Sequence, residues 1–400
     1  MAQFPGAGER NLDRTVDTDR LRNSWHVVSG YGSQVPLFFY STLFLTHPQV
    51  REMFPAGMSG QRDKLLAALG KVVANVDDLE IAVPFLQQLG RDHRKFAVSD
   101  EHYPAVGKAL LTTLEHFLGQ DWTPALSRDW TAAYGLVSEV MVAAAKESAQ
   151  TSPPWWNAEV LRHERRTAEV AVLLLRTDRP LSYLPGQSVA VESHLRPRMW
   201  RYYSPANPPR DDGVIELHVR MIDGGPVSSA LVQAITPGDT LRVGAPVGTR
   251  LTIDHKQDVV LIAGGTGLAP FKALLGQIAN EGFQRQVHLF AGARAARDFH
   301  DLAGIQAFAR ALPRLRIVPV VSEERGFRGA RGLVGDVALR HGPWPEHEVY
   351  VCGSPSMVAE TREMARAAGI GEERVHVEDF SGYGSPAETV PGIFQGDDRA

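Results

Sequence analysis

The chain has 400 residues, a length that favours two or three domains over a single hydrophobic core. Hydrophobic residues make up 44% and charged residues 22% of it, as in ordinary globular proteins, and the net charge of −4 argues against nucleic acid or an anionic membrane as a partner. The single cysteine, Cys352, excludes an internal disulfide and any four-cysteine iron–sulfur or zinc site.

The first residues of the chain are polar and mixed in charge. They contain no apolar run of signal-peptide length. We interpret residues 1–20 as a tail. No stretch of about 18 apolar residues occurs in the sequence, so we expect no membrane span and a cytoplasmic location.

Residues 21–150 predict an all-α domain. Apolar residues recur at helical spacing from Gln61 to Val76 and again from Trp130 to Lys146. Pro36 and Pro84 each stand where a helix could begin, because proline is tolerated in the first turn. We expect no strand in this third of the chain.

Residues 151–255 have a different pattern, which begins after Pro153-Pro154. Three β-rich segments are separated by proline and glycine turns, and a short helix is expected at 227–235; the segments are 167–176, 187–192 and 214–222. This pattern predicts a small antiparallel barrel.

Residues 256–385 alternate between apolar strands and helices, and residues 386–400 read as a tail. The strands are expected at 259–263, 287–292, 316–321, 349–353 and 375–380. Such alternation predicts a doubly wound parallel sheet with helices on both faces. The fold class is therefore multidomain: all-α, antiparallel barrel and α/β.

Two strands of this last domain end in turns suited to a nucleotide. The first turn, Gly264-Gly265-Thr266-Gly267 followed by Pro270, opens a helix, and glycines there let backbone amides approach a pyrophosphate. A tight strand–helix turn without a ligand explains that motif equally well. The second turn, Cys352-Gly353 with Met357, also enters a helix, and two such turns form the crevice where this architecture binds ligands.

These turns resemble those of the ferredoxin–NADP⁺ reductase superfamily, over roughly residues 155–385. The resemblance implies that the turn at 264–267 carries the pyrophosphate of a nicotinamide nucleotide and that Cys352, Gly353 and Met357 lie beside the nicotinamide. Arg294 could meet the 2′-phosphate of NADPH. Acidic residues nearby, Asp298 and Asp301, favour NADH as the preferred cofactor, with NADPH possible.

The same resemblance implies FAD in the barrel, and Arg201-Tyr202-Tyr203-Ser204 is its expected signature. Arg201 would bind the flavin pyrophosphate, and Tyr203 and Ser204 the ribityl chain and ring edge. Further turns of the family are matched, and they supply Gln187, Val227 and Ser228. Glu378 and Phe380 would flank the flavin ring, although a surface acid and a core phenylalanine fit that segment too.

The helical third resembles a globin, in three segments that occur in the globin order. These are residues 37–54, the segment from Gln61 to Leu65, and the segment around His93 that continues to Tyr103. A globin followed by such a reductase is similar to a flavohaemoglobin, over about residues 20–385. The resemblance implies haem b with His93 as the proximal iron ligand; the distal pocket would contain Tyr40, Gln61 and Leu65, with Phe54 on the haem and Tyr103 on the proximal side.

Taken alone, His93 and Tyr40 would more often be an ordinary core histidine and a core aromatic residue. Two positions also depart from the family pattern. Ala145 stands where a proximal glutamate is usual, and Asp92 stands where lysine commonly precedes the histidine. Without that glutamate, we expect the second ring nitrogen of His93 to donate to a backbone carbonyl or to Tyr103.

The sequence thus predicts an oxidoreductase in which electrons pass from NAD(P)H to FAD to haem, where O₂ binds. By resemblance the reaction is oxidation of nitric oxide to nitrate, and the partners are these small molecules, with a monomer or dimer expected. One alternative is a divergent flavohaemoglobin-like oxidoreductase with another electron donor or acceptor. Another is a gas-binding or gas-sensing globin, which the attached reductase disfavours.

Overall fold

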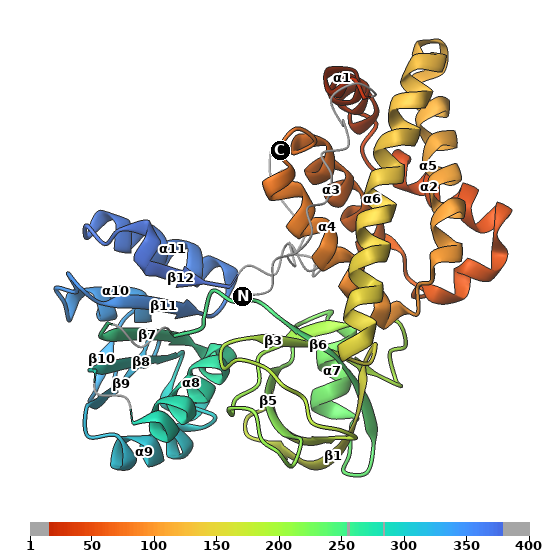
Figure 1. Cartoon of the computed structure of the whole chain (residues 1–400). Helices are drawn as coiled ribbons and strands as arrows, with labels where there is room; N and C mark the ends of the chain where they lie inside the picture. Colours follow the sequence, from red (N-terminus) through yellow and green to blue (C-terminus); the bar gives the residue numbers. More distant parts are fainter. Residues whose placement is uncertain (1–15, 254–256, 283–284, 379–400) are drawn as a thin grey trace, which may run out of the picture. The chain divides into compact units, whose positions relative to one another are not determined.

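The structure is a computed structural model that describes residues 16–253, 257–282 and 285–378 (Figure 1). The chain divides at Pro154 into two compact units, which we call the helical unit and the α/β unit. Together they contain the helical domain, the antiparallel barrel and the parallel-sheet domain that the sequence predicts, so the predicted fold class is confirmed.

The helical unit has no strand among its described residues, 16–154. Its helices are α1 (Thr18–Ser29), α2 (Gln34–Thr46), α3 (Ser59–Ala74), α4 (Leu79–His93), α5 (Tyr103–Leu118) and α6 (Pro124–Thr151), with short 3₁₀ turns such as η2 (Pro48–Met53) and η4 (Asp100–His102). Their apolar faces share one core, in which Leu43, Leu114 and Val28 are fully buried.

The predicted helix start at Pro84 is wrong. Helix α4 begins at Leu79, because the Asp78 carboxylate accepts a hydrogen bond from the Ile81 amide and caps the helix. Pro84 lies one turn further on, where its missing N–H leaves the carbonyl of Glu80 without an intrahelical donor. Helix α2 likewise begins before Pro36, at Gln34, and keeps that proline within its first turn.

Helices α4 and α6 approach each other at a glycine. A Cβ atom added to Gly90 would lie 2.2 Å from the carbonyl oxygen of Met141, which is closer than any real contact. Only glycine therefore allows the two backbones to meet there. This contact lies less than one helical turn before His93.

The barrel is a six-stranded antiparallel sheet in the order β4-β3-β6-β1-β2-β5. A bridge between Pro205 and Leu217 brings the chain after β4 to β5 and nearly closes it. Its elements are β1 (Trp156–Arg165), β2 (Val170–Thr177), β3 (Ser188–Ser193), β4 (Arg201–Tyr203), β5 (Val214–Arg220), α7 (Pro226–Gln233) and β6 (Thr240–Val247).

Three of these strands, β1, β4 and β6, are absent from the prediction. In β1, Trp156, Ala158 and Val160 face the core in alternation, but a bulge between Val160 and Arg162 then breaks the period. The residues from Arg162 to Arg165 are polar or charged, so only the first half of the ten-residue strand has the alternation of apolar and polar residues that predicts a strand.

The last domain is a parallel sheet in the order β10-β9-β8-β7-β11-β12. Figure 1 shows α8 and α9 on one face and α10 and α11 on the other, each face with its own apolar core. The elements are β7 (Val259–Gly264), η6 (Gly265–Gly267), α8 (Leu268–Glu281), β8 (Val287–Ala293), η7 (Ala296–Asp298), α9 (Leu302–Ala311), β9 (Leu315–Val321), β10 (Ala330–Arg331), α10 (Val334–Arg340), β11 (Glu348–Cys352), α11 (Pro355–Ala367), η8 (Glu372–Arg374) and β12 (Val375–Val377).

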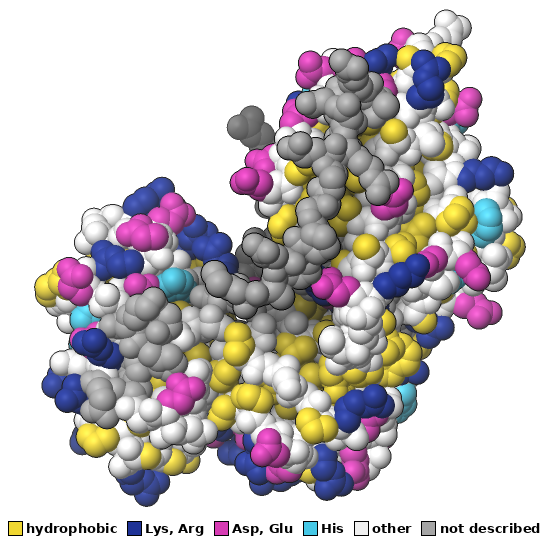
Figure 2. Space-filling view, in the orientation of Figure 1, with side chains coloured by type: hydrophobic (Ala, Val, Ile, Leu, Met, Phe, Trp, Pro, Cys, Tyr) yellow, Lys and Arg dark blue, Asp and Glu magenta, His cyan; other side chains and the backbone are white. Residues whose placement is uncertain are grey.

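The surface carries charges of both signs. Figure 2 shows basic and acidic side chains scattered over the visible face of each unit, without a large patch of one sign. None of the helices in the described parts of the chain combines the length and hydropathy needed to cross a membrane.

Candidate functional site

Tyr40, on α2, lies in an aromatic environment inside the helical unit. Its ring centroid is 5.4 Å from that of Phe54 and 5.7 Å from that of Phe44. The hydroxyl is 3.5 Å from the carbonyl oxygen of Gln61, at the limit of a hydrogen bond. Burial raises the pKa of Tyr40 to about 12, so the phenol keeps its proton and remains a donor.

His93 is the last residue of α4. Its Nδ1 lies 2.7 Å from the carbonyl oxygen of Leu89. A carbonyl can only accept, so Nδ1 carries the ring proton and Nε2 is the nitrogen available to ligate a metal. Of the two acceptors predicted for His93, the structure contains the backbone carbonyl. Burial lowers the pKa of His93, which favours the neutral ring that iron needs.

Tyr103 begins α5, where its carbonyl accepts a hydrogen bond of 2.6 Å from the hydroxyl of Tyr134. The half-buried Ala145 lies on α6. Asp92, the other departure, forms an ion pair of 3.2 Å with Lys95, whose side chain is buried. The charge at position 92 is thus balanced one turn along the chain.

Several apolar side chains of α3 and α4 are incompletely buried. Among the residues of α3 only Val73 is buried, and Leu65 and Leu69 keep partial exposure. On α4, Phe85 and Leu89 are also only half-buried. Incompletely buried apolar side chains and the available Nε2 of His93 both suit haem. Leu65 also packs against the helical core that contains Tyr40.

On the barrel, the predicted flavin residues come together on neighbouring strands. Arg201 begins β4, Tyr203 ends it, and the Ser204 hydroxyl is 2.8 Å from that of Ser188 on β3. Arg201 donates one guanidinium hydrogen bond to the carbonyl of Trp200 and is only half-buried, so further donors remain for an anion.

Gln187 holds a turn of the barrel. Its side-chain oxygen accepts from the Leu184 amide and its side-chain nitrogen donates to the Gly248 carbonyl, each at 2.8 Å. The preceding Gly186 has φ of +95°, and a Cβ there would lie 2.4 Å from the carbonyl oxygen of Leu251. Both residues thus shape the segment that would border the flavin.

Helix α7 begins beside the buried Val227 and Ser228. The Ser228 hydroxyl accepts from the Ile222 amide at 3.1 Å and donates to the Gly225 carbonyl at 3.2 Å, which closes the preceding loop. The first backbone N–H groups of α7 have no intrahelical acceptor and suit the phosphates of FAD.

The two nucleotide turns lie side by side, because β7 and β11 are neighbours and Ala263 pairs with Cys352. A Cβ on Gly267 would lie 2.2 Å from the Cys352 carbonyl oxygen. The Met357 sulfur would lie within 2.4 Å of a Cβ on either Gly264 or Gly353. The glycines are thus required by close packing within the crevice, and burial raises the pKa of the Cys352 thiol to about 12.

Other predicted residues surround this crevice. Thr266 lies in η6, and Pro270 is a buried residue in the first turn of α8. The Glu378 carboxylate lies against Gly248, where a Cβ would come within 2.7 Å of it. Phe380 lies outside the described residues. A cleft at the ends of β7 and β8 is lined by Gly265, Gly292, Asp298, His300 and Asp301, among others.

Arg294, expected near a 2′-phosphate, follows β8 and already has an acidic partner. Its guanidinium is 3.2 Å from the carboxylate of Glu169, which directly precedes β2, and Arg220 lies 3.2 Å from the same carboxylate. All three side chains are exposed. Arg294 therefore shares one negative charge with another arginine.

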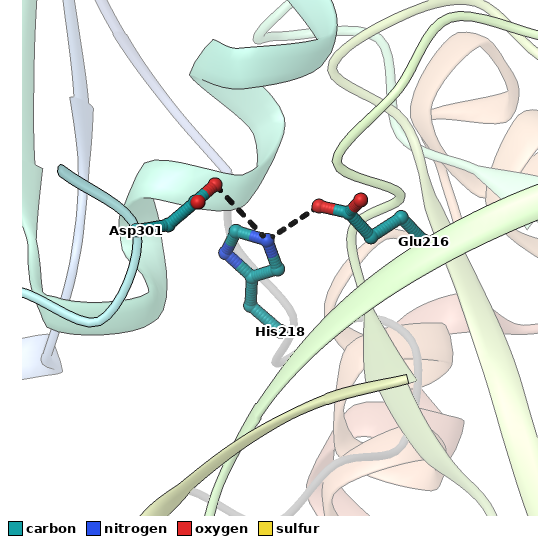
Figure 3. Close-up of side chains that lie close together, drawn as sticks. All are labelled: Glu216, His218 and Asp301. Carbon is teal, nitrogen blue, oxygen red and sulfur yellow. Dashed lines mark hydrogen bonds and ion pairs between the residues drawn. The ribbon is translucent and has the colours of Figure 1, made fainter. Parts of the chain in front are cut away.

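A buried polar cluster beside the crevice has no counterpart in the prediction (Figure 3). Glu216 and His218 project from β5 of the barrel, and Asp301 stands at the start of α9. The sequence carries one signal for it: Glu216 and His218 alternate with Ile215, Leu217 and Val219, which places a glutamate and a histidine on the face of β5 opposite its core residues.

Comparisons with known proteins match the helical domain, the barrel and the parallel-sheet domain separately. Family models match for a globin at residues 37–141, an oxidoreductase FAD-binding domain at 157–251 and an oxidoreductase NAD-binding domain at 261–363. A flavohemoprotein of Bordetella parapertussis is 30% identical over 386 residues, which cover 88% of this chain and 95% of the relative. One from Bacillus subtilis is 26% identical over 399 residues, covering 92% and 98%.

A solved structure shares the fold, and a further relative matches part of the chain. The crystal structure of flavohemoglobin from Malassezia yamatoensis with bound FAD and heme aligns with a TM-score of 0.74 at 17% identity, over 90% of this chain and 97% of that one. The α/β unit alone is similar to the xylene/toluene monooxygenase electron transfer component of Pseudomonas putida, 34% identical over 230 residues, or 56% of this chain and 65% of the relative.

Proposed function

The chain belongs to the flavohaemoprotein family, and on that premise we propose that it is a nitric oxide dioxygenase, which converts nitric oxide to nitrate. As a member of this family it passes electrons from NAD(P)H through FAD to haem. Haem, when bound, supplies the binding and activation of dioxygen. His93 would hold it through Nε2, and the α/β unit would deliver its electrons.

The observation that supports dioxygenase chemistry is the Tyr40 hydroxyl. It is a buried donor among aromatic rings, and its contact with the Gln61 carbonyl is long. A polar diatomic ligand in that pocket can accept a stronger hydrogen bond from the phenol. The polarity of the pocket decides whether a globin stores oxygen or activates it.

The test uses the full-length protein loaded with haem and FAD. We expect NADH to reduce both cofactors without oxygen, and the aerobic protein to consume nitric oxide and yield one nitrate for each. Tyr40→Phe, which removes only the hydroxyl, should slow this consumption by about ten-fold or more. Its rate of haem reduction by NADH should be unchanged, because Tyr40 has no part in electron delivery.

One observation favours a second candidate, an oxidoreductase of this family with a different electron acceptor. His93 donates to an uncharged carbonyl, and Ala145 replaces the usual acid, so the ring pushes less electron density toward iron. Rapid haem reduction without nitrate formation would favour this candidate. Failure of NADH to reduce the haem would instead favour a gas-binding globin.

We propose the cofactor-binding roles of the following residues as part of this function. Arg201, the turn at Ser228 and the strand end at Glu378 would hold FAD, and the glycine turns would hold NADH. The domain limits 21–150, 151–255 and 256–385, the cytoplasmic location and a monomeric or dimeric state stay predictions from the sequence.

A further inference from the structure

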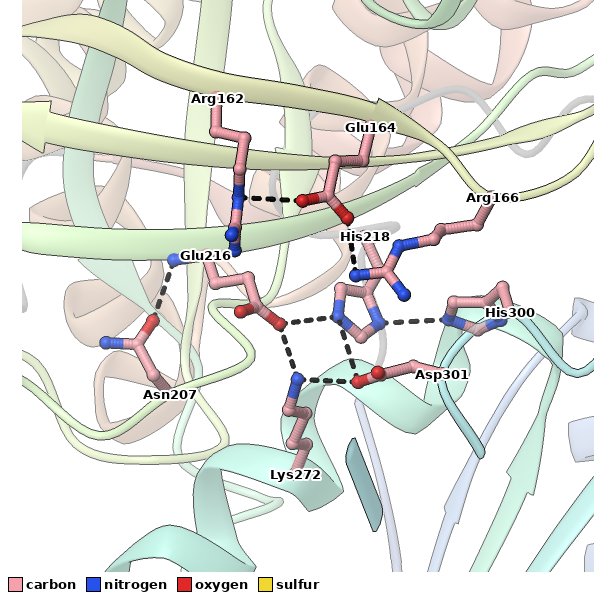
Figure 4. A network of polar contacts seen from close by, with 9 residues as sticks. All are labelled: Arg162, Glu164, Arg166, Asn207, Glu216, His218, Lys272, His300 and Asp301. Atoms are coloured by element: carbon pink, nitrogen blue, oxygen red, sulfur yellow. Dashed lines mark hydrogen bonds and ion pairs between the residues drawn. The ribbon is translucent and has the colours of Figure 1, made fainter. Parts of the chain in front are cut away.

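The polar cluster beside the crevice is a continuous network of five side chains (Figure 4). Lys272 on α8 is at its centre: its Nζ lies 2.6 Å from the Glu216 carboxylate and 2.5 Å from that of Asp301. His218 Nε2 lies 2.8 Å from Glu216, and His218 Nδ1 lies 3.0 Å from Nε2 of His300.

One proton of this network is fixed by its acceptor. The Glu216 carboxylate can only accept, so His218 Nε2 carries a proton and donates to it, and the contact between His218 Nδ1 and His300 Nε2 joins one donor to one acceptor. Burial and the neighbouring His218 lower the pKa of His300 to about 4, which keeps it neutral at physiological pH.

The carboxylates of Glu216 and Asp301 share the single ammonium of Lys272, and all three side chains are largely shielded from solvent. Burial alone would raise the pKa of Glu216, but the His218 hydrogen bond and the Lys272 charge outweigh it and hold that pKa at about 2. The same carboxylates raise the pKa of Lys272 against the effect of burial. Glu216, His218 and Asp301 have the spacing of a metal site, yet the Lys272 ammonium already bonds to both carboxylates and supplies the cation.

The network joins the two halves of the α/β unit. Glu216 and His218 belong to β5 of the barrel, whereas Lys272, His300 and Asp301 belong to the parallel-sheet domain. Lys272 lies one turn after the glycine turn at 264–267, from which α8 begins. His300 and Asp301 also line the cleft at the ends of β7 and β8.

We propose that Lys272 is a positioning residue for hydride transfer: its contacts to Glu216 and Asp301 hold the nucleotide turns in register with the FAD barrel. The inference rests on the proposed electron route. In that step a hydride, which is one proton with two electrons, would pass from the nicotinamide to the flavin, and the flavin would also take up one proton from solvent. Rates of such transfers depend steeply on geometry, and a displacement near 1 Å can slow them by about a hundred-fold.

The experiment compares Lys272→Met with Arg362→Met in the full-length protein loaded with FAD. The control removes the cation of an exposed ion pair, Arg362–Glu372, within the parallel-sheet domain. FAD reduction by NADH is followed without oxygen by the loss of flavin absorbance, so the haem is not needed as an acceptor. We expect the limiting rate of Lys272→Met to fall by about a hundred-fold. The control should keep the wild-type rate.

A second measurement, hydrogen exchange, tests whether the network holds the barrel and the parallel-sheet domain in place. Hydrogen exchange should speed up at residues 214–220 and 299–302 in Lys272→Met, in both the FAD-loaded and the FAD-free protein, and stay unchanged in Arg362→Met. Lys272→Arg keeps the charge and should recover most of the rate. Glu216→Gln, which keeps the shape and a hydrogen-bonding amide, should slow FAD reduction in the same direction and provides the test if Lys272→Met does not fold.

The proposal is overturned if Lys272→Met or Glu216→Gln folds, binds FAD and reduces it at the rate of the control, or if exchange at both segments is unchanged. Failure of the proposed electron route is a different result, because the wild-type protein itself would then leave its FAD oxidised in the presence of NADH.

Discussion

The helical unit holds the half-buried His93, and the α/β unit holds the buried His218, in opposite ways. His93 donates to an uncharged backbone carbonyl, whereas His218 donates to the Glu216 carboxylate within a network that also contains Lys272. In the helical unit, His93 Nε2 and the Tyr40 hydroxyl have capacity for a bound group. In the α/β unit the polar side chains of the network satisfy one another and join two domains.

This difference predicts where substitutions act. Removal of an uncharged contact leaves little behind, but removal of one member of a buried ion pair leaves an uncompensated charge. Substitutions at the histidine of the helical unit should therefore change what is bound. Substitutions in the network should change the structure and its dependence on pH.

The largest effect is expected for His93→Ala. Nε2 is the group that would ligate iron, so the purified variant should lose nearly all of its haem, measured from the absorbance of the haem relative to FAD. Compared without haem, the variant fold should lose only about 1 kcal/mol relative to the wild type, because one uncharged hydrogen bond disappears. His26→Ala, on the same unit, is the control. Full haem content in His93→Ala would contradict the proximal role.

Acid should affect the α/β unit through His300. Its pKa lies near 6.5 when unfolded and about 4 when folded, so the unfolded chain takes up the proton first and stability falls as the pH drops from 6.5 to 4. This difference corresponds to about 3 kcal/mol. Glu216, with a folded pKa of about 2, adds a further loss only below its ordinary value of 4.5.

His300→Gln should flatten the upper part of that pH profile, measured by the temperature at which FAD is released. His163→Gln serves as the control, since His163 is a half-buried histidine of the same unit that bonds to the Leu231 carbonyl. Equal slopes for the wild type and His300→Gln between pH 6.5 and 4 would show that the network does not carry this dependence.

Ala145→Glu should make the helical unit more like the other one by offering His93 a charged acceptor. We expect a lower haem reduction potential and peroxidase-type activity about ten-fold higher, as for other changes at the partner of a metal-bound histidine. The iron–histidine stretching frequency of the ferrous protein reports the effect, and Ala145→Gln is the uncharged control. A wild-type frequency already typical of a strongly anionic ring would refute the expectation.

The smallest effect concerns the exposed charges at Arg294. Glu169→Gln would free this arginine for a 2′-phosphate and should raise the preference for NADPH over NADH by about five-fold, within the 1 kcal/mol expected of an exposed ion pair. Glu159→Gln, which breaks the exposed pair of Glu159 with Arg176, is the control. An unchanged ratio of specificity constants would mean that Glu169 does not restrain Arg294.

The sequence predicts well the parts of the chain where a local pattern and a local contact coincide. The glycine turn at 264–267 and the turn at Cys352 follow apolar strands, and they come together because parallel strands end at the same edge. The short strand β4, which has three residues, and β1, which contains a bulge, offer too little periodicity to be found.

The network could not be predicted, because its members are far apart in the chain. Glu216 and Lys272 are 56 residues apart, and His218 and His300 are 82 apart. No local sequence pattern predicts that side chains of β5 will contact Lys272 of α8. The start of α4 was misplaced for the opposite reason: the Asp78 cap is local, but the proline at 84 is the more conspicuous signal.

The glycine contact between α4 and α6 has a consequence for the order of events during synthesis. Gly90 can approach Met141 only once α6 exists, and Met141 is made 51 residues after Gly90. Domains fold as units as the chain emerges. A nascent chain that ends before α6 contains His93 but lacks the helix against which the His93 end of α4 packs. Haem capture should therefore wait until α6 has left the ribosome, by which time translation of the barrel has begun.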